Sequence, residues 1–302
     1  PAYYNDEVII PALQNRGLTL EDAREYNIIG CVEPQKAGKT DGWHDAAFFN
    51  MCRPLEMVFS NGYDNGEIAS IQTGNVESFQ SFDEFMEAYR KQMLYNIELM
   101  VNADNAMVDD CIKRGMSAQE GGAIYNFTGP QGFGIANVAD SLYTIKKLVF
   151  EEKRITMGEL KKALEMNYGK GLDATTAGDI AMQVAKGLKD AGQEVGPDVI
   201  ANTIRQVLEM ELPEDVRKRY EEIHEMILEL PKYGNDIDEV DELAREAAYF
   251  YTRPLETFKN PRGGMYQAGL YPVSANVPLG AQTDATPDGR LAHTPVADGV
   301  GP

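Results

Sequence analysis

The sequence predicts a mixed α and β protein in which helices dominate. Long stretches repeat apolar residues at helical spacing, and several of them follow a Ser or Thr that has an acidic residue three positions later. Short apolar runs elsewhere are bounded by Gly, Pro and Asn, as strands are. The chain has 302 residues, of which 43% are hydrophobic, so it contains enough apolar material for a core. It has no long linker, so we expect one domain.

The N-terminal elements lead to a cysteine. Residues 6–17 contain a short β-branched apolar run, and Thr19 with Asp22 then has the spacing of a capping box, which predicts a helix over "LTLEDAREY". The following "NIIG" predicts a short strand or a buried turn. Cys31 is therefore expected on a loop just past a buried element.

The middle of the chain alternates helices with one strand. Ser81 and Glu84 repeat the capping signal ahead of a long amphipathic helix. The Gly-rich "GGAIYNFTGPQGFG" predicts a strand that enters an irregular loop, and "NVADSLYTIKKLVFEE" returns to helical spacing. Thr156 and Glu159 then cap a further helix. The apolar residues of the long helix are Phe82, Phe85, Met86, Tyr89, Met93 and Ile97.

The second half is helical and then changes character. Residues 179–258 predict helix after helix, with breaks at "GQEVGPD", "ELPED" and "PKYGNDIDEVD". The last segment, from "GGMYQAGLYPVSANVPLG" onward, changes to short β-like runs separated by Gly, Pro and Asn. "GPQGFG" is not a phosphate loop, because no Lys-Ser/Thr pair follows it.

Charge and cysteine content exclude several classes of protein. The formal net charge of -20 disfavours nucleic acid and anionic membrane surfaces as partners, because both bind clustered Lys and Arg. No apolar run approaches the length of a membrane span and no signal peptide opens the chain, so a cytosolic location is expected. The three cysteines lack CxxC spacing and are odd in number, which argues for reduced thiols rather than disulfides or a zinc site.

Cys31 and Glu33 favour one-electron chemistry over thiolate chemistry. A thiolate nucleophile needs a nearby cation or a general base such as His44, but the nearest ionisable neighbour is Glu33, and a negative charge disfavours a thiolate. A thiyl radical is neutral, and the carboxylate can then accept a substrate proton. The alternatives are a buried structural Cys31, a solvated Glu33, and a turn or helix cap at His44 and Asp45. Cys52 and Cys111 are interpreted as buried structural cysteines.

Read as one stretch, "GCVEPQKAGKTDGWHDAAFFN" closely resembles the active-site cysteine loop of glycyl radical enzymes, whose signature Gly-Cys-Val-Glu-Pro corresponds to Gly30–Pro34. The resemblance continues through "QEGGAIYNFTGPQGFGIANVADSL", "LPKYGNDIDEVD" and "YPVSANVPLGAQTDATPDGR". It implies an α/β fold, part of a ten-stranded barrel of two half-barrels sheathed in helices. This chain, 1–302, would be a single partial catalytic domain that carries the cysteine loop.

The continuation "GKTDGWHDAAFFN" is similar to the cobalamin-independent dehydratases of glycerol and propane-1,2-diol. By that resemblance, Cys31 is the thiyl site, Glu33 accepts the proton of the C1 hydroxyl and Asp45 binds the substrate hydroxyls. "YPVSANVPLG" is similar to a late strand and loop that wall the substrate pocket, which makes Val277 a steric contact with the substrate; a core valine is the alternative.

The resemblance also implies what lies outside the chain. The radical glycine and the N-terminal half, with the histidine expected to protonate the leaving hydroxyl, are absent, so this chain alone would be inactive. Relatives carry an extra stretch at "NADNAMVDDCIKRG", so residues are expected to be missing between Ala106 and Met107, and a helix that continues there would not be real.

The expected cofactor is a glycyl radical, with no cobalamin and no metal. The expected partners are a small diol, a radical S-adenosylmethionine activating enzyme and a second copy of the chain, in an anaerobic cytosol or a bacterial microcompartment. The alternatives are a related lyase or dehydratase acting on choline, isethionate or hydroxyproline, and an inactive truncated chain.

Overall fold

A computed structural model describes most of the chain, with short gaps. The described residues are 4–29, 33–37, 39–64, 66–113, 125–171, 174–193, 195–208, 212–260 and 263–301. The chain divides into two compact units. Unit 1 comprises Pro1–Phe49, Asn96–Gly132 and Tyr249–Tyr271; unit 2 comprises Asn50–Tyr95, Phe133–Ala248 and Pro272–Pro302. The expectation of a single partial domain stays a prediction.

Two short helices open unit 1. Helix α1 (Asp6–Asn15) contains the β-branched apolar run, which is helical because its residues pack on a small cluster of Leu13, Leu18 and Ala23. Helix α2 (Leu20–Arg24) begins as predicted, with the Thr19 hydroxyl accepting from the Asp22 backbone N–H at 3.1 Å. The predicted strand follows directly as β1 (Asn27–Ile29).

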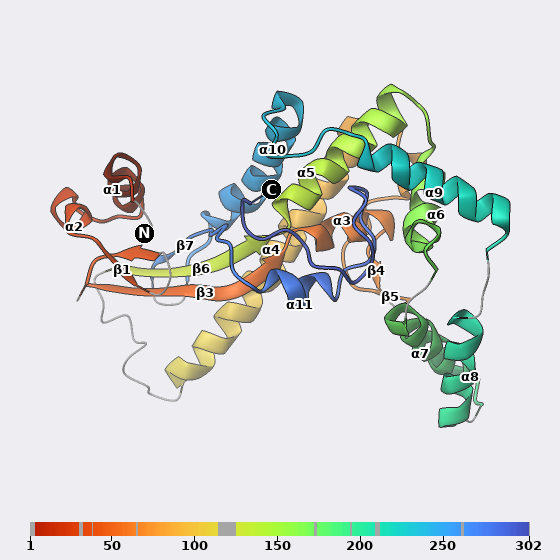
Figure 1. Ribbon diagram of the computed structural model, residues 1–302. Helices are drawn as coiled ribbons and strands as arrows, with labels where there is room; N and C mark the ends of the chain where they lie inside the picture. The colour runs from red at the N-terminus through yellow and green to blue at the C-terminus, as the bar shows by residue number, and fades with distance from the viewer. Residues whose placement is uncertain are drawn as a thin grey trace. The chain divides into compact units, whose positions relative to one another are not determined.

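Unit 1 holds a three-stranded sheet in the order β3, β6, β7 (Figure 1). These strands are β3 (Thr40–Asn50), β6 (Tyr125–Phe133) and β7 (Met265–Tyr266). Strand β6 was predicted, and its parallel partner β7 pairs Phe127 with Met265. The hydroxyl of Tyr251 donates to the Pro130 carbonyl at 2.9 Å, so a buried tyrosine satisfies a strand carbonyl beside the sheet.

Unit 2 is mainly helical. The described helices of the chain from residue 52 onward are α3 (Cys52–Phe59), α4 (Phe82–Lys113), α5 (Ile135–Thr144), α6 (Met157–Glu165), α7 (Ala174–Asp190), α8 (Pro197–Leu208), α9 (Glu214–Leu228), α10 (Asp238–Leu255) and α11 (Asn276–Gly280). A π-helix, η3 (Ile145–Glu151), continues α5, and short 3₁₀ helices occur at η1 (Val76–Ser78) and η4 (Asn167–Gly169). A two-stranded hairpin joins β4 (Tyr63–Asp64) to β5 (Glu67–Ile68).

The capping predictions are confirmed with one shift. Thr156 and Glu159 form both reciprocal bonds of a capping box at the start of α6. At α4 the Ser81 hydroxyl accepts from the Glu84 N–H at 3.2 Å, but the Glu84 carboxylate reaches past Ser81 to the N–H of Gln80. The predicted apolar face of α4 is buried from Phe85 to Ile97, with Phe82 half-buried.

One expectation differs from the structure and another stays a prediction. The segment 271–280 was expected to begin as a strand, and this is wrong: it is a turn followed by helix α11, because the Val277 N–H bonds to the Ser274 carbonyl instead of to a neighbouring strand. Helix α4 runs through Ala106 and Met107 to Lys113, and the expectation that residues are missing between these two stays a prediction.

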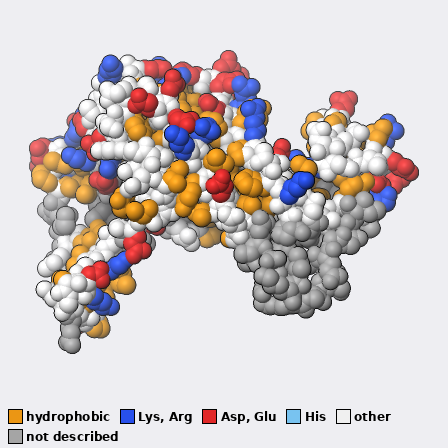
Figure 2. Space-filling view, turned by 180° about the vertical axis from the view of Figure 1, so that it is seen from behind, with side chains coloured by type: hydrophobic (Ala, Val, Ile, Leu, Met, Phe, Trp, Pro, Cys, Tyr) orange, Lys and Arg blue, Asp and Glu red, His pale blue; other side chains and the backbone are white. Residues whose placement is uncertain are grey.

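Charged side chains are dispersed over the face shown in Figure 2. Acidic and basic side chains alternate with hydrophobic and uncharged ones, and no large basic area occurs on the described part of that face. Among the described residues, no helix combines the length and the apolar character needed to cross a membrane.

Candidate active site

Glu33 is buried at the start of a strand. Strand β2 (Glu33–Gln35) pairs antiparallel with β1, and Glu33 is opposite Ile29 in the register. The residue is only 4% exposed, whereas acidic residues are mostly exposed in folded proteins. A solvated loop carboxylate is therefore the wrong interpretation of Glu33 in this chain. Cys31 comes between these paired residues in the sequence and lies outside the described residues, so its predicted role stays a prediction.

Asp45 lies within strand β3 and has a left-handed backbone. Its φ is 55°, and its side chain is exposed. Asp tolerates this region better than most residues because its short polar side chain can hydrogen-bond locally. The helix cap that was one alternative for Asp45 is wrong, since the residue lies within a strand that extends to Asn50, and its predicted role in binding substrate hydroxyls stays a prediction.

Tyr271 brings the two carboxylates into one electrostatic environment. Burial raises the pKa of the Tyr271 phenol, and the negative charges of Glu33 and Asp45 raise it further. A phenol in these surroundings stays protonated and can donate a hydrogen bond. Glu33 and Asp45, which are 12 positions apart in the printed sequence, therefore both act on the same phenol.

Arg16 adds a positive charge to this group. It opposes the carboxylates by lowering the pKa of Tyr271, and its guanidinium pairs with the Glu256 carboxylate at 2.7 Å. Sequence reasoning missed Tyr271 and Arg16. Tyr271 opens the stretch "YPVSANVPLG", so the motif itself was the available signal.

Val277 lies in helix α11 of unit 2 and is 52% exposed. It is therefore not a core valine in this chain, which removes the alternative considered for it. Its contact with a substrate stays a prediction.

The second cysteine is structural, as predicted. Cys52 is fully buried at the start of α3, its thiol lies 3.8 Å from the Gly134 carbonyl oxygen, and burial raises its pKa well above the usual range. A thiol held neutral in this way is unreactive. Cys111 is in α4, and its side chain lies outside the described ones.

The "TPDGR" segment of the motif folds as a turn that is bonded both internally and to helix α5. The Asp288 carboxylate accepts from the Thr286 hydroxyl at 2.5 Å and from the Asn137 amide at 2.6 Å. The Arg290 guanidinium donates to backbone carbonyls of the same turn region, among them Leu291 and Thr294 at 3.0 and 2.7 Å. Both charged side chains therefore hold the local chain path in unit 2.

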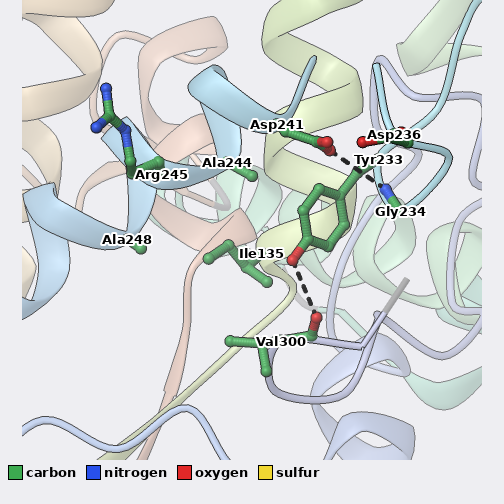
Figure 3. Close-up of a pocket in the computed structure, with 9 residues that line it drawn as sticks. All are labelled: Ile135, Tyr233, Gly234, Asp236, Asp241, Ala244, Arg245, Ala248 and Val300. Carbon is green, nitrogen blue, oxygen red and sulfur yellow. Dashed lines mark hydrogen bonds between the residues drawn. The ribbon is translucent and has the colours of Figure 1, made fainter. Parts of the chain in front are cut away.

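A pocket of about 610 Å³ lies in unit 2 between the start of α10 and the residues near Val300 (Figure 3). Its polar groups contact one another: the Tyr233 hydroxyl donates to the Val300 carbonyl at 3.2 Å, and the Gly234 N–H points to Asp241. None of the residues predicted for the site lines this pocket. It therefore carries no part of the predicted chemistry. Among the described residues, no group of three or more His, Cys, Asp and Glu is placed to hold a metal ion.

Comparisons with known proteins place the chain. A family model described as pyruvate formate lyase-like matches residues 1–280. A solved structure concerned with 1,2-propanediol dehydration in Roseburia inulinivorans is 91% identical and superposes with a TM-score of 0.93, covering 100% of this chain and 38% of that one. The B12-independent glycerol dehydratase of Clostridium butyricum, solved with glycerol bound, is 46% identical with a TM-score of 0.78, covering 99% of this chain and 34% of that one.

Curated relatives agree with the structural ones. The (2S)-3-sulfopropanediol dehydratase of Klebsiella oxytoca is 33% identical over 320 aligned positions, which include 100% of this chain and 33% of the relative. The chain thus spans about a third of the length of the relatives that it matches. The alignment is longer than the 302 residues of the chain, so this relative contains residues that the chain lacks.

The fold and these matches define part of the α/β barrel of a glycyl radical enzyme. The chain belongs to the pyruvate formate lyase-like family, as the sequence motifs predicted.

Proposed function

We propose that this chain is the part of a glycyl radical diol dehydratase that carries the cysteine loop, and that the whole protein converts propane-1,2-diol to propanal and water. The observation that carries the proposal is the burial of Glu33, which is 4% exposed and follows Cys31 by two positions, because a carboxylate beside the thiyl site can accept the proton of a substrate hydroxyl. The 91% identity to the protein studied for 1,2-propanediol dehydration favours this diol over glycerol, for which the relative is 46% identical.

The residues present fit a protein radical, since a thiol precedes a buried carboxyl by two positions. The glycyl radical, on a glycine outside this chain, supplies the unpaired electron that Cys31 uses.

The proposed reaction begins when the Cys31 sulfur radical removes the hydrogen atom from C1 of the diol and becomes a thiol. Glu33 accepts the proton of the C1 hydroxyl, which makes the carbon radical electron-rich. Asp45 and the protonated phenol of Tyr271 hold the hydroxyls in place, so the hydroxyl on C2 leaves the carbon that adjoins the radical.

The leaving hydroxyl takes a proton from an acid in the part of the enzyme outside this chain and departs as water. The resulting carbon radical then takes a hydrogen atom back from the Cys31 thiol. This step releases the aldehyde and restores the sulfur radical, so the net change is the loss of one water molecule from the diol.

By the same resemblance, the whole enzyme would be activated by a radical S-adenosylmethionine enzyme and work as a homodimer, in the cytosol or in a bacterial microcompartment. The absence of cobalamin from the reaction is supported by the description of the Clostridium butyricum relative as B12-independent.

The test is an anaerobic assay of the intact, activated enzyme. Propane-1,2-diol, glycerol, choline, isethionate and trans-4-hydroxy-L-proline are supplied separately, and carbonyl products are measured with unactivated enzyme as the control. We expect propanal from propane-1,2-diol and slower turnover of glycerol. Product from one of the last three substrates, with no aldehyde from either diol, would show that the protein belongs to another subgroup of the family. The absence of a glycyl radical signal in electron paramagnetic resonance after activation would instead indicate an inactive chain.

A further inference from the structure

Asp22 of helix α2 is a buried acid with two side-chain donors. The residue is 5% exposed, and one carboxylate oxygen accepts from the Lys39 ammonium at 2.6 Å while the other accepts from the Tyr125 hydroxyl at 2.7 Å. These bonds lower the pKa of Asp22, the one from Lys39 most strongly. The Thr19 hydroxyl at the helix start also contributes to lowering the pKa of Asp22, but the short bonds of the carboxylate are those to Lys39 and Tyr125, which belong to two other segments.

The two donors come from the beginnings of two neighbouring strands. Lys39 directly precedes β3, and Tyr125 is the first residue of β6. The Tyr125 N–H also donates to the Lys39 carbonyl at 3.0 Å, and its hydroxyl accepts weakly from the Thr19 N–H at 3.4 Å. The Tyr125 ring packs against the small apolar cluster of α1 and α2. We name the contacts among Thr19, Asp22, Lys39 and Tyr125 the Asp22 network. This network therefore attaches the start of β3 to helices α1 and α2.

Lys39 is the member of the Asp22 network that lies between the two candidate carboxylates along the chain. Glu33 begins β2, the turn at Lys36 and Lys39 follows, and β3 then leads to Asp45. Within this turn the Lys36 N–H donates to the Thr40 hydroxyl at 3.1 Å, and the Thr40 N–H donates to the Lys36 carbonyl at the same distance. Because the turn is bonded internally, holding Lys39 in place also fixes the position of the end of β2 and of the start of β3.

A neighbouring ion pair provides the contrast. Lys36 pairs with Glu25 at 2.5 Å, and the acid of that pair is 67% exposed, whereas the Asp22 side chain is 8% exposed; the lysines rank the other way, with Lys36 15% and Lys39 41% exposed. Exposed pairs contribute little to structure because water screens them and side-chain entropy opposes them. The two acids lie near each other in sequence and contact the same turn, so Glu25 serves as a matched control for Asp22.

We propose that Asp22 is a positioning residue for the active site: through Lys39 and Tyr125 it fixes the turn from which β2 and β3 diverge, and thereby the placement of Glu33 and Asp45 about Tyr271. The catalytic consequence rests on the proposed function, whereas the structural consequence does not. Removing the carboxylate charge should loosen this turn while the rest of the fold remains.

The first test needs no activity. Hydrogen–deuterium exchange is measured on the intact, unactivated enzyme for wild type and for Asp22→Asn, Lys39→Met and Glu25→Gln. We expect faster exchange in peptides covering residues 33–45 for the first two variants, and wild-type exchange for Glu25→Gln. Unchanged exchange of residues 33–45 in both Asp22→Asn and Lys39→Met would overturn the proposal, as would equal loosening by Glu25→Gln.

The second test measures turnover after activation. We expect kcat on propane-1,2-diol to fall by about 10- to 100-fold in Asp22→Asn, the size of effect that misplacement by about 1 Å produces, with a normal yield of glycyl radical. Asp22→Asn/Lys39→Met should lose no more than the worse single variant, because both remove one interaction. Additive losses, or a full kcat in Asp22→Asn, would contradict the positioning role. If wild type turns over neither diol, the proposed function fails and the exchange result alone decides on Asp22.

Discussion

The Cys52 sulfur occupies the space that a side chain on Gly134 would need. A Cβ placed on Gly134 would come within 2.8 Å of that sulfur, and the glycine also has a φ of +85° at the start of α5. Two separate features therefore favour glycine at position 134: the left-handed backbone conformation and the lack of space beside Cys52.

Gly134→Ala is expected to destabilise the intact enzyme through both effects. A left-handed residue with a Cβ costs about 1–2 kcal/mol, and overpacking of a core adds about 1–3 kcal/mol. The measurement is the apparent melting temperature. Gly17→Ala is the control, since Gly17 has a φ of +95° but nothing within 4 Å of a Cβ. The double variant Cys52→Ala/Gly134→Ala should regain the stability that Gly134→Ala loses through overpacking, but not the part lost through the left-handed backbone. Equal losses in the two glycine variants would show that the sulfur contact is unimportant.

Cys31→Ala and Glu33→Gln should each abolish turnover of the activated enzyme, because one removes the hydrogen-atom carrier and the other the proton acceptor. Cys52→Ala should retain turnover, since that thiol is buried away from solvent and neutral. Aldehyde formation measures all three, and the glycyl radical signal confirms activation. Retained turnover in Cys31→Ala would refute the assignment of the thiyl site.

Asp45→Asn should mainly impair the use of substrate. The amide tolerates the left-handed backbone at φ 55° as the acid does, so the variant changes the charge and leaves the chain path intact. We expect a higher KM and a lower kcat/KM for propane-1,2-diol, with a normal yield of glycyl radical by electron paramagnetic resonance. Loss of the radical itself would count against a role in binding the substrate hydroxyls.

Glu56 should make stability depend on pH between about 4.5 and 7. Burial raises the pKa of this carboxyl from 4.5 to about 7, against the opposing effect of Arg53. Within that range the folded protein keeps a proton that the unfolded chain releases. The free energy of unfolding therefore falls as pH rises, by on the order of 3 kcal/mol across the range, and this contribution is constant above it.

Melting temperatures of wild type and Glu56→Gln across pH 5 to 7.5 test this dependence. We expect wild type to lose stability relative to the variant as pH rises through that range. Glu87→Gln is the control, because Arg90 lowers the pKa of Glu87 and its contribution is already complete above pH 5. A constant difference between wild type and Glu56→Gln would contradict the raised pKa.

Local signals in the sequence predicted the elements well and their long-range partners poorly. Thr19 and Thr156 marked helix starts because capping depends on residues within one turn. The prediction of a strand at 271–280 was wrong because the Val and Pro residues of this segment are compatible with an extended chain. They are equally compatible with the turn and helix that form. Tyr271 was missed for a different reason: its relation to Glu33 exists only after distant segments have folded together.

The candidate site depended on resemblance more than on pattern. Taken singly, Glu33 was interpreted as a solvated carboxylate and Asp45 as part of a turn or helix cap, and only the whole motif selected them from the other carboxylates. The structure adds that Glu33 is buried and that both act on Tyr271. Asp22 was quoted only as part of a helix signal, because its contacts with Lys39 and Tyr125 come from segments far along the chain.

The parallel pairing of Phe127 with Met265 sets an order in which this protein can be made. The helices from α5 to α10 separate the two strands in the sequence, so on the ribosome β6 emerges long before β7 exists. At a synthesis rate of ~5–20 residues per second, that edge of β6 stays open for on the order of ten seconds. Nascent chains stalled before residue 265 should therefore depend on chaperones more than chains stalled after residue 271, since an unpaired strand edge invites association with other chains.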